Sequence, residues 1–249
     1  MSHVPALSST PTRRRLATHF AGCDPVIAAL VEAAGPFKLR PIECASPFRH
    51  LAEAIISQQI SGRAAEAILK RFVASFDADA DFPTPKSVIA IKENSLRGAG
   101  LSAAKVAAIR DLARKTEEGV VPDTRTLVTL DDHEIIERLT VVRGIGPWTV
   151  QMMLMFQLGR PDVLPIADYG VRHGFRIAYR LRKLPTPREL ARHGERWAPF
   201  RSAAAWYLWR AVDLERAGTA WQRPKIRIWR APLRSGASAR QRRSGARTR

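Results

Sequence analysis

Two glycines one residue apart, Gly144 and Gly146, stand between two stretches of helical periodicity, and Pro147 follows them directly. Glycine permits a tight turn and a close approach of the backbone to another group, and proline is favoured at the first position of a helix. The stretch from Leu139 to Val150 therefore predicts two helices joined by a sharp hairpin, with Ile145 anchoring the turn in the core. Backbone N–H groups at such a turn and helix start suit a phosphate oxygen, although an ordinary helix connection also fits the two glycines.

Helix start signals recur along the rest of the chain. Asp24-Pro25 and Ser46-Pro47 each combine an N-cap residue with a proline, and Ser61, Ser102 and Asp131 precede further apolar faces of helical spacing. No convincing strand alternation is present. The sequence therefore predicts an all-α fold.

The charge is uneven along the 249 residues, which carry a formal net charge of +18. Residues 223–249 hold ten Lys and Arg and no acid, and residues 1–20 are rich in Ser, Thr and Pro with three arginines. We expect 1–20 to be a disordered basic arm, 21–222 the globular body, and 223–249 a disordered basic tail. The tail either adds non-specific affinity for a polyanion or is a solvated appendage, and the sequence leaves both open.

Several classes of protein are excluded or disfavoured. The sequence has no run of 18 apolar residues, so no membrane span is expected. The two cysteines, Cys23 and Cys44, are too few for a disulfide framework or a four-thiolate cluster, and we expect free thiols. No metal-binding motif is present, so we expect no catalytic metal and no cofactor.

The flanks of the hairpin carry a family resemblance. Leu139–Val150 resembles the helix-hairpin-helix element that grips the DNA backbone without reading sequence. By this resemblance Gly144, Ile145, Gly146 and Thr149 would contact DNA phosphates. In the glycosylase superfamily built on this element, an essential aspartate follows some twenty residues later.

The matching residue here is Asp168, twenty-two residues after Gly146. An acid after a proline-containing loop is, by itself, most often a helix N-cap, and Asp168 can serve both roles. Cleavage of the bond between base and deoxyribose builds positive charge on the sugar. A nearby carboxylate stabilises that charge and can orient or deprotonate the attacking water. The resemblance therefore implies that Asp168 is catalytic.

Three further segments resemble the alkylpurine branch, 3-methyladenine DNA glycosylase II. They are the Gln-containing helix at 54–61, the G-L-S-x-x-K loop at 100–105, and the E-x-W-x-P-x-R-S segment at 195–202, where Phe200 replaces a tryptophan. The resemblance spans about 45–212 and implies a compact form without the N-terminal α/β domain of some members. It implies base flipping from duplex DNA and hydrolysis of the N-glycosidic bond.

Single positions refine this expectation. Bifunctional relatives carry a nucleophilic lysine where this chain has Trp148, which implies a monofunctional enzyme that uses water. Trp148 and Trp209 would stack on a cationic alkylated base, with Gln58 and Tyr169 also at the pocket. Met152 stands where the family has a tyrosine, so the range of bases accepted is open.

The resemblance also implies an arrangement in space. We expect two helical lobes, one from about Ser61 to Gln157 and one joining the N-terminal helices to those after Asp168. A wedge residue is expected within 59–61, and the hairpin carbonyls could bind a monovalent ion. The expected partner is double-stranded DNA with damaged bases, bound by a monomer without membrane contact, in the cytoplasm and nucleoid of a bacterium or the nucleus of a eukaryote.

Two alternatives remain. A glycosylase for oxidised or mismatched bases is disfavoured by the absent lysine and the absent cysteine cluster. A non-catalytic helix-hairpin-helix module needs neither Asp168 nor Trp209.

Overall fold

The computed structural model describes residues 11–39, 41, 46–76, 81–222 and 224. Within these ranges the chain forms thirteen α-helices and one 3-10 helix, and no strand. The predicted all-α fold is therefore confirmed. None of the described helices combines the length and the apolar character that a membrane crossing needs.

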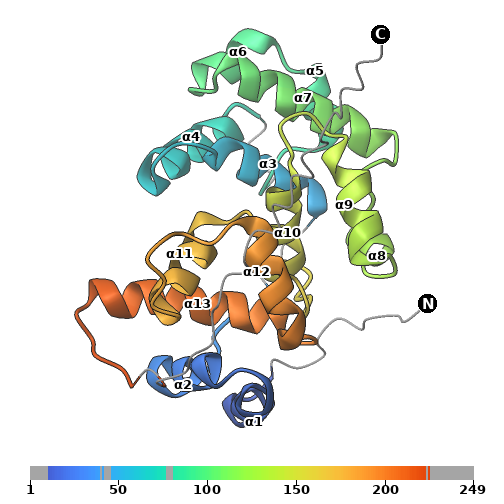
Figure 1. Ribbon diagram of the computed structural model, residues 1–249. Coiled ribbons are helices and arrows are strands. Elements are labelled where there is room, and N and C mark those ends of the chain that lie inside the picture. Colours follow the sequence, from blue (N-terminus) through green and yellow to red (C-terminus); the bar gives the residue numbers. More distant parts are fainter. Residues whose placement is uncertain (1–10, 40, 42–45, 77–80, 223, 225–249) are drawn as a thin grey trace, which may run out of the picture.

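The helices pack as two lobes (Figure 1). In the first lobe α7 is central and packs against α3, α5 and α6, while α10 packs against α3 and α9. Its helices are α3 (Pro47–Ser57), α4 (Gly62–Ala74), α5 (Pro85–Ala90), α6 (Glu93–Gly98), α7 (Ala103–Glu117), α8 (Thr124–Leu127), α9 (Asp132–Thr140) and α10 (Pro147–Phe156).

The second lobe joins the two ends of the described chain. Helix α13 packs against α2 and α11, and α1 packs against α2. Its helices are α1 (Arg13–Cys23), α2 (Pro25–Ala34), α11 (Tyr169–Ala178), α12 (Pro187–Gly194), the 3-10 helix η1 (Glu195–Trp197) and α13 (Arg201–Arg216).

Two boundary predictions need correction. Helix α3 was assigned to the N-terminal helices, but it packs on α4, α7 and α10, so the first lobe begins one helix before Ser61. Residues 13–20 are not a disordered arm: they form most of α1, where Leu16 and Phe20 are 0% exposed. Burial of these two apolar side chains outweighs the polar, arginine-rich composition of the segment.

Other predictions fall outside the description. Residues 1–10, Cys44 and, apart from Pro224, the tail 223–249 are not among the described residues. Cys23 is a free thiol.

The predicted start signals are confirmed. Asp24, Ser46, Ser61, Ser102 and Asp131 cap α2, α3, α4, α7 and α9, each side chain accepting from a first-turn amide. These bonds satisfy N–H groups that have no partner within the helix.

Asp24 also ties the second lobe together. Its buried Oδ2 accepts hydrogen bonds from Tyr179 Oη at 2.6 Å and Trp197 Nε1 at 2.9 Å, and His193 Nε2 lies 2.9 Å away. Burial raises the pKa of this carboxyl, but the bonds from His193, Tyr179 and Trp197 outweigh it, so that the net shift is downward. The first turn of α2 is thereby joined to α11, α12 and η1.

Two glycines on one face of α11 let α13 approach closely. A Cβ at Gly174 would lie 1.9 Å from the backbone oxygen of Leu208, and one at Gly170 would lie 2.8 Å from Cδ1 of Trp209. Since these glycines are four residues apart, they lie above one another on the same face of the helix. This contact fixes Trp209 relative to the start of α11.

Candidate active site

The hairpin joins α9 to α10 as the two glycines predict. Gly144 has a φ of 79°, and a Cβ there would lie 3.3 Å from Cβ of Ala108 on α7. A Cβ at Gly146 would meet no atom within 4 Å, so the space in front of it is open. Ile145 is 5% exposed and anchors the turn, as expected. The two glycines therefore serve different purposes, a left-handed turn and an open face.

The open face presents backbone amides. Helix α10 has no side-chain cap, and the amides of its first turn have no acceptor within the helix. Trp148 and Thr149 lie in this turn, although the Thr149 side chain is 6% exposed and contributes little surface. The N–H of Ile145 donates to Val142 O at 3.0 Å. Ile145 is therefore an anchor, and the prediction that it contacts phosphate does not fit its bonded amide and buried side chain.

Helix α7 braces the hairpin from behind. Asp111 Oδ2 accepts from Arg143 N at 2.8 Å and from Lys115 Nζ at 2.7 Å, and Lys115 also donates to Val141 O at 2.7 Å. Burial raises the pKa of Asp111, but the bonds from Arg143 and Lys115 outweigh it and lower the pKa overall. Neither Asp111 nor Lys115 was predicted as a site residue, because an acid and a lysine four apart look like an ordinary helix surface pair.

Asp168 is the N-cap of α11 and lies where the two lobes meet. Its Oδ1 accepts from Val171 N at 2.7 Å and from Trp209 Nε1 at 2.9 Å, and its Oδ2 accepts from Trp148 Nε1 at 2.9 Å. One carboxylate is thus held by donors from α10, α11 and α13. Trp148 is the second residue of α10, so the carboxylate lies beside the helix that the hairpin begins.

The two carboxylate oxygens are not equivalent. A carboxylate offers about four lone-pair sites over its two oxygens. Oδ1 accepts two of the bonds given above and Oδ2 accepts one, from an indole that is 46% exposed. Oδ2 is therefore the oxygen with acceptor capacity left for a ligand.

Two indoles flank the carboxylate, and further apolar side chains continue from them. Trp148, Met152 and Phe156 follow one another at four-residue intervals, on one face of α10. The ring of Phe156 stacks on Trp209, with centroids 5.9 Å apart and planes 24° apart. Trp148, Met152 and Trp209 were predicted from the sequence. Phe156 was not, although the same four-residue spacing indicates it.

Gly170 is a further site residue that was not predicted from the sequence. A Cβ there would lie 2.8 and 2.9 Å from Cδ1 and Nε1 of Trp209, and 3.1 Å from Oδ1 of Asp168. The two distances to Trp209 are shorter than real Cβ contacts, and the distance to Asp168 is tighter than most. Glycine at this position therefore leaves the room in which the Trp209 indole reaches Asp168.

Two predicted pocket residues have other surroundings. Gln58 Nε2 donates to Gly144 O at 2.9 Å and so joins the α3–α4 turn to the hairpin. Tyr169 follows Asp168 directly, is 66% exposed, and lies beside His173 with ring centroids 5.5 Å apart. Their contact with a base stays a prediction.

No cluster of metal-binding side chains occurs among the described residues. The hairpin carbonyls of Val141, Val142 and Gly144 each accept a bond from Lys115, Ile145 or Gln58. A monovalent ion on these carbonyls stays a prediction.

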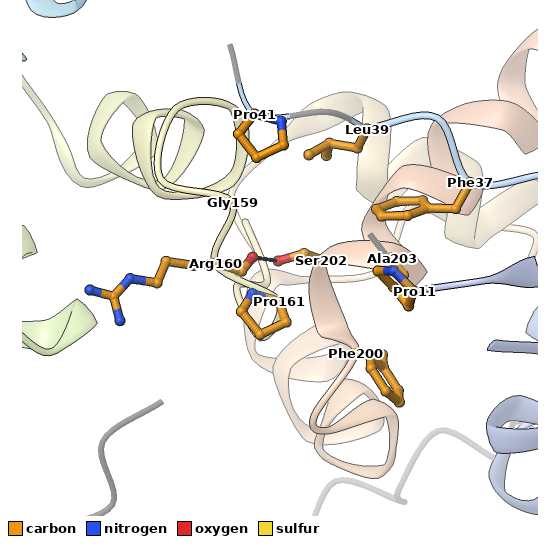
Figure 2. A pocket seen from close by; sticks show the side chains of 10 residues that line it. All are labelled: Pro11, Phe37, Leu39, Pro41, Gly159, Arg160, Pro161, Phe200, Ser202 and Ala203. Atoms are coloured by element: carbon orange, nitrogen blue, oxygen red, sulfur yellow. Dashed lines mark hydrogen bonds between the residues drawn. The ribbon is translucent and has the colours of Figure 1, made fainter. Parts of the chain in front are cut away.

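An apolar hollow lies elsewhere in the second lobe (Figure 2). Phe37, Leu39, Pro161 and Phe200 line it, and Ser202 Oγ donates to Arg160 O at 2.7 Å beside it. None of the residues that surround Asp168 lines this hollow, which is thus separate from the candidate site.

A family model described as HhH-GPD superfamily base excision DNA repair protein matches residues 52–200. The chain belongs to this superfamily. The match contains α10, the hairpin and Asp168. Asp168 thus lies within the part of the chain that the family model matches.

Individual relatives agree with this membership. The HhH-GPD chain is 40% identical over 197 residues to DNA-3-methyladenine glycosylase 1 of Schizosaccharomyces pombe, covering 79% of this chain and 86% of the relative. A solved 3-methyladenine DNA glycosylase from that organism, in complex with abasic DNA, superposes with a TM-score of 0.69 at 39% identity over 78% of this chain and 95% of that one. A DNA-3-methyladenine glycosidase from Bacillus halodurans gives a TM-score of 0.71 at 32% identity over 80% and 89%.

Proposed function

We propose that this HhH-GPD protein is a monofunctional DNA glycosylase that excises alkylated purines from duplex DNA. The observation that carries the proposal is the Asp168 carboxylate, held by the indoles of Trp148 and Trp209 beside the first turn of α10. The hairpin amides would hold a phosphate of the damaged strand, and the flipped nucleotide would bring its sugar to Asp168.

The chemistry follows from the charge that develops on the sugar. As the bond from C1′ to the base nitrogen breaks, the electron pair leaves with the base and the sugar becomes cationic. Asp168 Oδ2 stabilises that cation and accepts the proton of the water whose oxygen bonds to C1′. The products are the free base and an abasic site.

The aromatic side chains beside Asp168 suit a cationic leaving base. A purine alkylated at N3 or N7 carries a positive charge, which the faces of electron-rich rings attract. Trp148 is 46% exposed and so retains free ring surface beside the carboxylate. A base that already carries positive charge leaves as a neutral molecule, so the site needs no strong acid to protonate it.

Trp148 also supports a hydrolytic mechanism. A Schiff-base mechanism needs an amine nucleophile at the sugar. Trp148 occupies the position of that amine in the bifunctional pattern, and its Nε1 is a donor only. Water is therefore the nucleophile we propose, and no strand cleavage should follow excision.

We further propose that the protein acts on DNA as a monomer, because one chain supplies the hairpin, Asp168 and both indoles. The basic charge of the chain fits a polyanionic partner. The cellular compartment stays a prediction.

The direct test is release of free bases from methylated duplex DNA by the full chain. We expect 3-methyladenine and 7-methylguanine in the supernatant, abasic sites in the DNA, and no borohydride-trapped adduct. Duplexes with 8-oxoguanine or a mismatch are the comparison. If bases were released only from these duplexes, the protein would be a glycosylase for oxidised or mismatched bases. If it bound DNA but released no base, it would be a non-catalytic module.

The contacts of Asp111 and Lys115 with the hairpin give a second prediction. Asp111→Ala should weaken binding to intact and damaged duplexes alike, by about three- to tenfold, because Arg143 N and Lys115 Nζ lose the acceptor that orients the hairpin. Removal of an acidic charge would, by electrostatics alone, strengthen binding to DNA. The expected sign is therefore opposite to the effect of charge.

Fluorescence anisotropy with both duplexes at one salt concentration measures this effect. Glu118→Ala removes an exposed acid at the end of the same helix and serves as the matched control, with unchanged or slightly tighter binding expected. Equal affinity changes for the two variants would contradict the role of Asp111 in orienting the hairpin.

A further inference from the structure

The turn between α3 and α4 holds an unusual backbone conformation. Gln59 has a φ of 58°, a left-handed value that few non-glycine residues adopt, and Ile60 is 38% exposed despite its apolar side chain. Ser61 then caps α4. Backbone strain of this kind persists only when the surrounding structure fixes it.

Lys105 of α7 fixes this turn. Its Nζ donates to Ile56 O at 2.6 Å and to Gln58 O at 2.9 Å, across 47 to 49 positions of sequence. These carbonyls belong to the C-terminal end of α3, where a cation is electrostatically favoured and free carbonyls need donors. One ammonium group thus caps the C-terminal end of α3 and helps to set the direction in which the chain leaves this helix.

The loop that carries Lys105 is built to bring it there. Gly100 has a φ of 100°, and a Cβ there would lie 3.0 Å from Nη2 of Arg71 and 3.3 Å from Cγ1 of Ile68, both on α4. Ser102 caps α7, its Oγ accepting from Lys105 N at 3.3 Å. The G-L-S-x-x-K pattern at 100–105 therefore places a lysine in the first turn of α7.

The same turn is joined to the hairpin. Gln58, whose carbonyl oxygen accepts from Lys105, donates through Nε2 to Gly144 O at 2.9 Å. The α3–α4 turn and the hairpin, two segments 86 positions apart, thus lie side by side at the surface. Gln59 and Ile60 are exposed next to the element that would hold a phosphate.

We propose that Lys105 is a positioning residue for base excision, which holds the α3–α4 turn in the conformation where Gln59 and Ile60 reach the duplex at the flipped nucleotide. This proposal rests on the proposed function. We assign Lys105 to the turn and not to the substrate, because two of its three N–H groups are bound to backbone carbonyls. Burial lowers the pKa of Lys105, as expected for an ammonium group drawn away from water.

The test compares Lys105→Met with the parent in the full chain. Met is unbranched and one atom shorter than Lys, and it leaves both carbonyls without this donor. We expect the single-turnover excision rate to fall about tenfold, and the affinity for an abasic-site duplex to fall about tenfold relative to an intact duplex. Binding to the intact duplex should stay within about twofold, because the hairpin amides are unchanged.

A double-mutant cycle shows whether Lys105 acts through the turn. In a background with both Gln59→Ala and Ile60→Ala the turn has little left to present, so that Lys105→Met should cost less than about twofold more. Lys86→Met removes an exposed lysine of the same lobe and is the charge control, expected to change neither rate nor affinity ratio. Rates are normalised to titrated active sites, so a loss of folded protein does not count, and Lys105→Gln replaces the Met variant if that variant does not fold.

The outcomes separate the two proposals. Failure of the parent to release any base would refute the proposed glycosylase, while the affinity ratio would still report on Lys105. An active parent with an equally active Lys105→Met, or full additivity in the cycle, would overturn the positioning role and leave the glycosylase standing.

Discussion

Asp168→Asn is expected to lower the single-turnover rate of base excision by at least about 10³-fold while leaving DNA affinity within about twofold. The amide removes the negative charge that would face the cationic sugar and cannot take a proton from water. It also places an NH2 group against one of the indole donors, Trp148 Nε1 or Trp209 Nε1, which both donate to Asp168. The hairpin amides remain, so binding should persist.

The measurement is release of 7-methylguanine from one defined duplex under single-turnover conditions, with affinity measured on the same duplex. Asp162→Asn is the matched control, since Asp162 lies in the same loop but binds Arg201, at 2.7 Å to Nε and 2.7 Å to Nη2. We expect that control to excise within about threefold of the parent. An Asp168→Asn protein as active as the parent would remove Asp168 from the mechanism.

Local signals in the sequence were sufficient for much of the site. The cap residue and proline of α2 and α3 fixed their starts, and the two glycines before Pro147 fixed the hairpin. The chemistry of these signals acts within a few residues, which is why a single sequence carries it. Asp168 was singled out by the resemblance to the helix-hairpin-helix glycosylases, and the structure adds that capping and indole bonds hold the same carboxylate.

Contacts between distant segments could not be predicted in the same way. The periodicity of α3 shows which face is buried but not that α7 and α10 cover it. Asp111 looks like an ordinary surface charge of α7, and Lys105 is marked only by the G-L-S-x-x-K resemblance. The fold alone brings them to Arg143 N and to the end of α3. Helix α1 was missed because Leu16 and Phe20 are two apolar residues in a polar segment, and their partners lie elsewhere in the chain.

Gly170 illustrates how such a contact can control the site. Gly170→Ala is expected to lower the excision rate by about 10²-fold, or ~2.7 kcal/mol in activation free energy. The new methyl group would overlap the Trp209 indole at 2.8 Å and crowd Asp168 Oδ1 at 3.1 Å. The indole cannot move aside freely, because it stacks on Phe156 and donates to Asp168. The carboxylate would lose one of its three donors and its orientation.

The stability of Gly170→Ala should change much less than its activity. Alanine is favoured over glycine within a helix by up to about 1 kcal/mol, which offsets part of the steric cost at Gly170. We therefore expect the melting temperature to change little while excision falls. Gly22→Ala, at a helical glycine with no atom within 4 Å of its Cβ position, is the control and should leave excision unchanged. In a Trp209→Phe background, where the smaller ring leaves room and has no N–H, Gly170→Ala should cost less than about threefold more. A full hundredfold loss in that background would mean that Gly170 acts on Asp168 without Trp209.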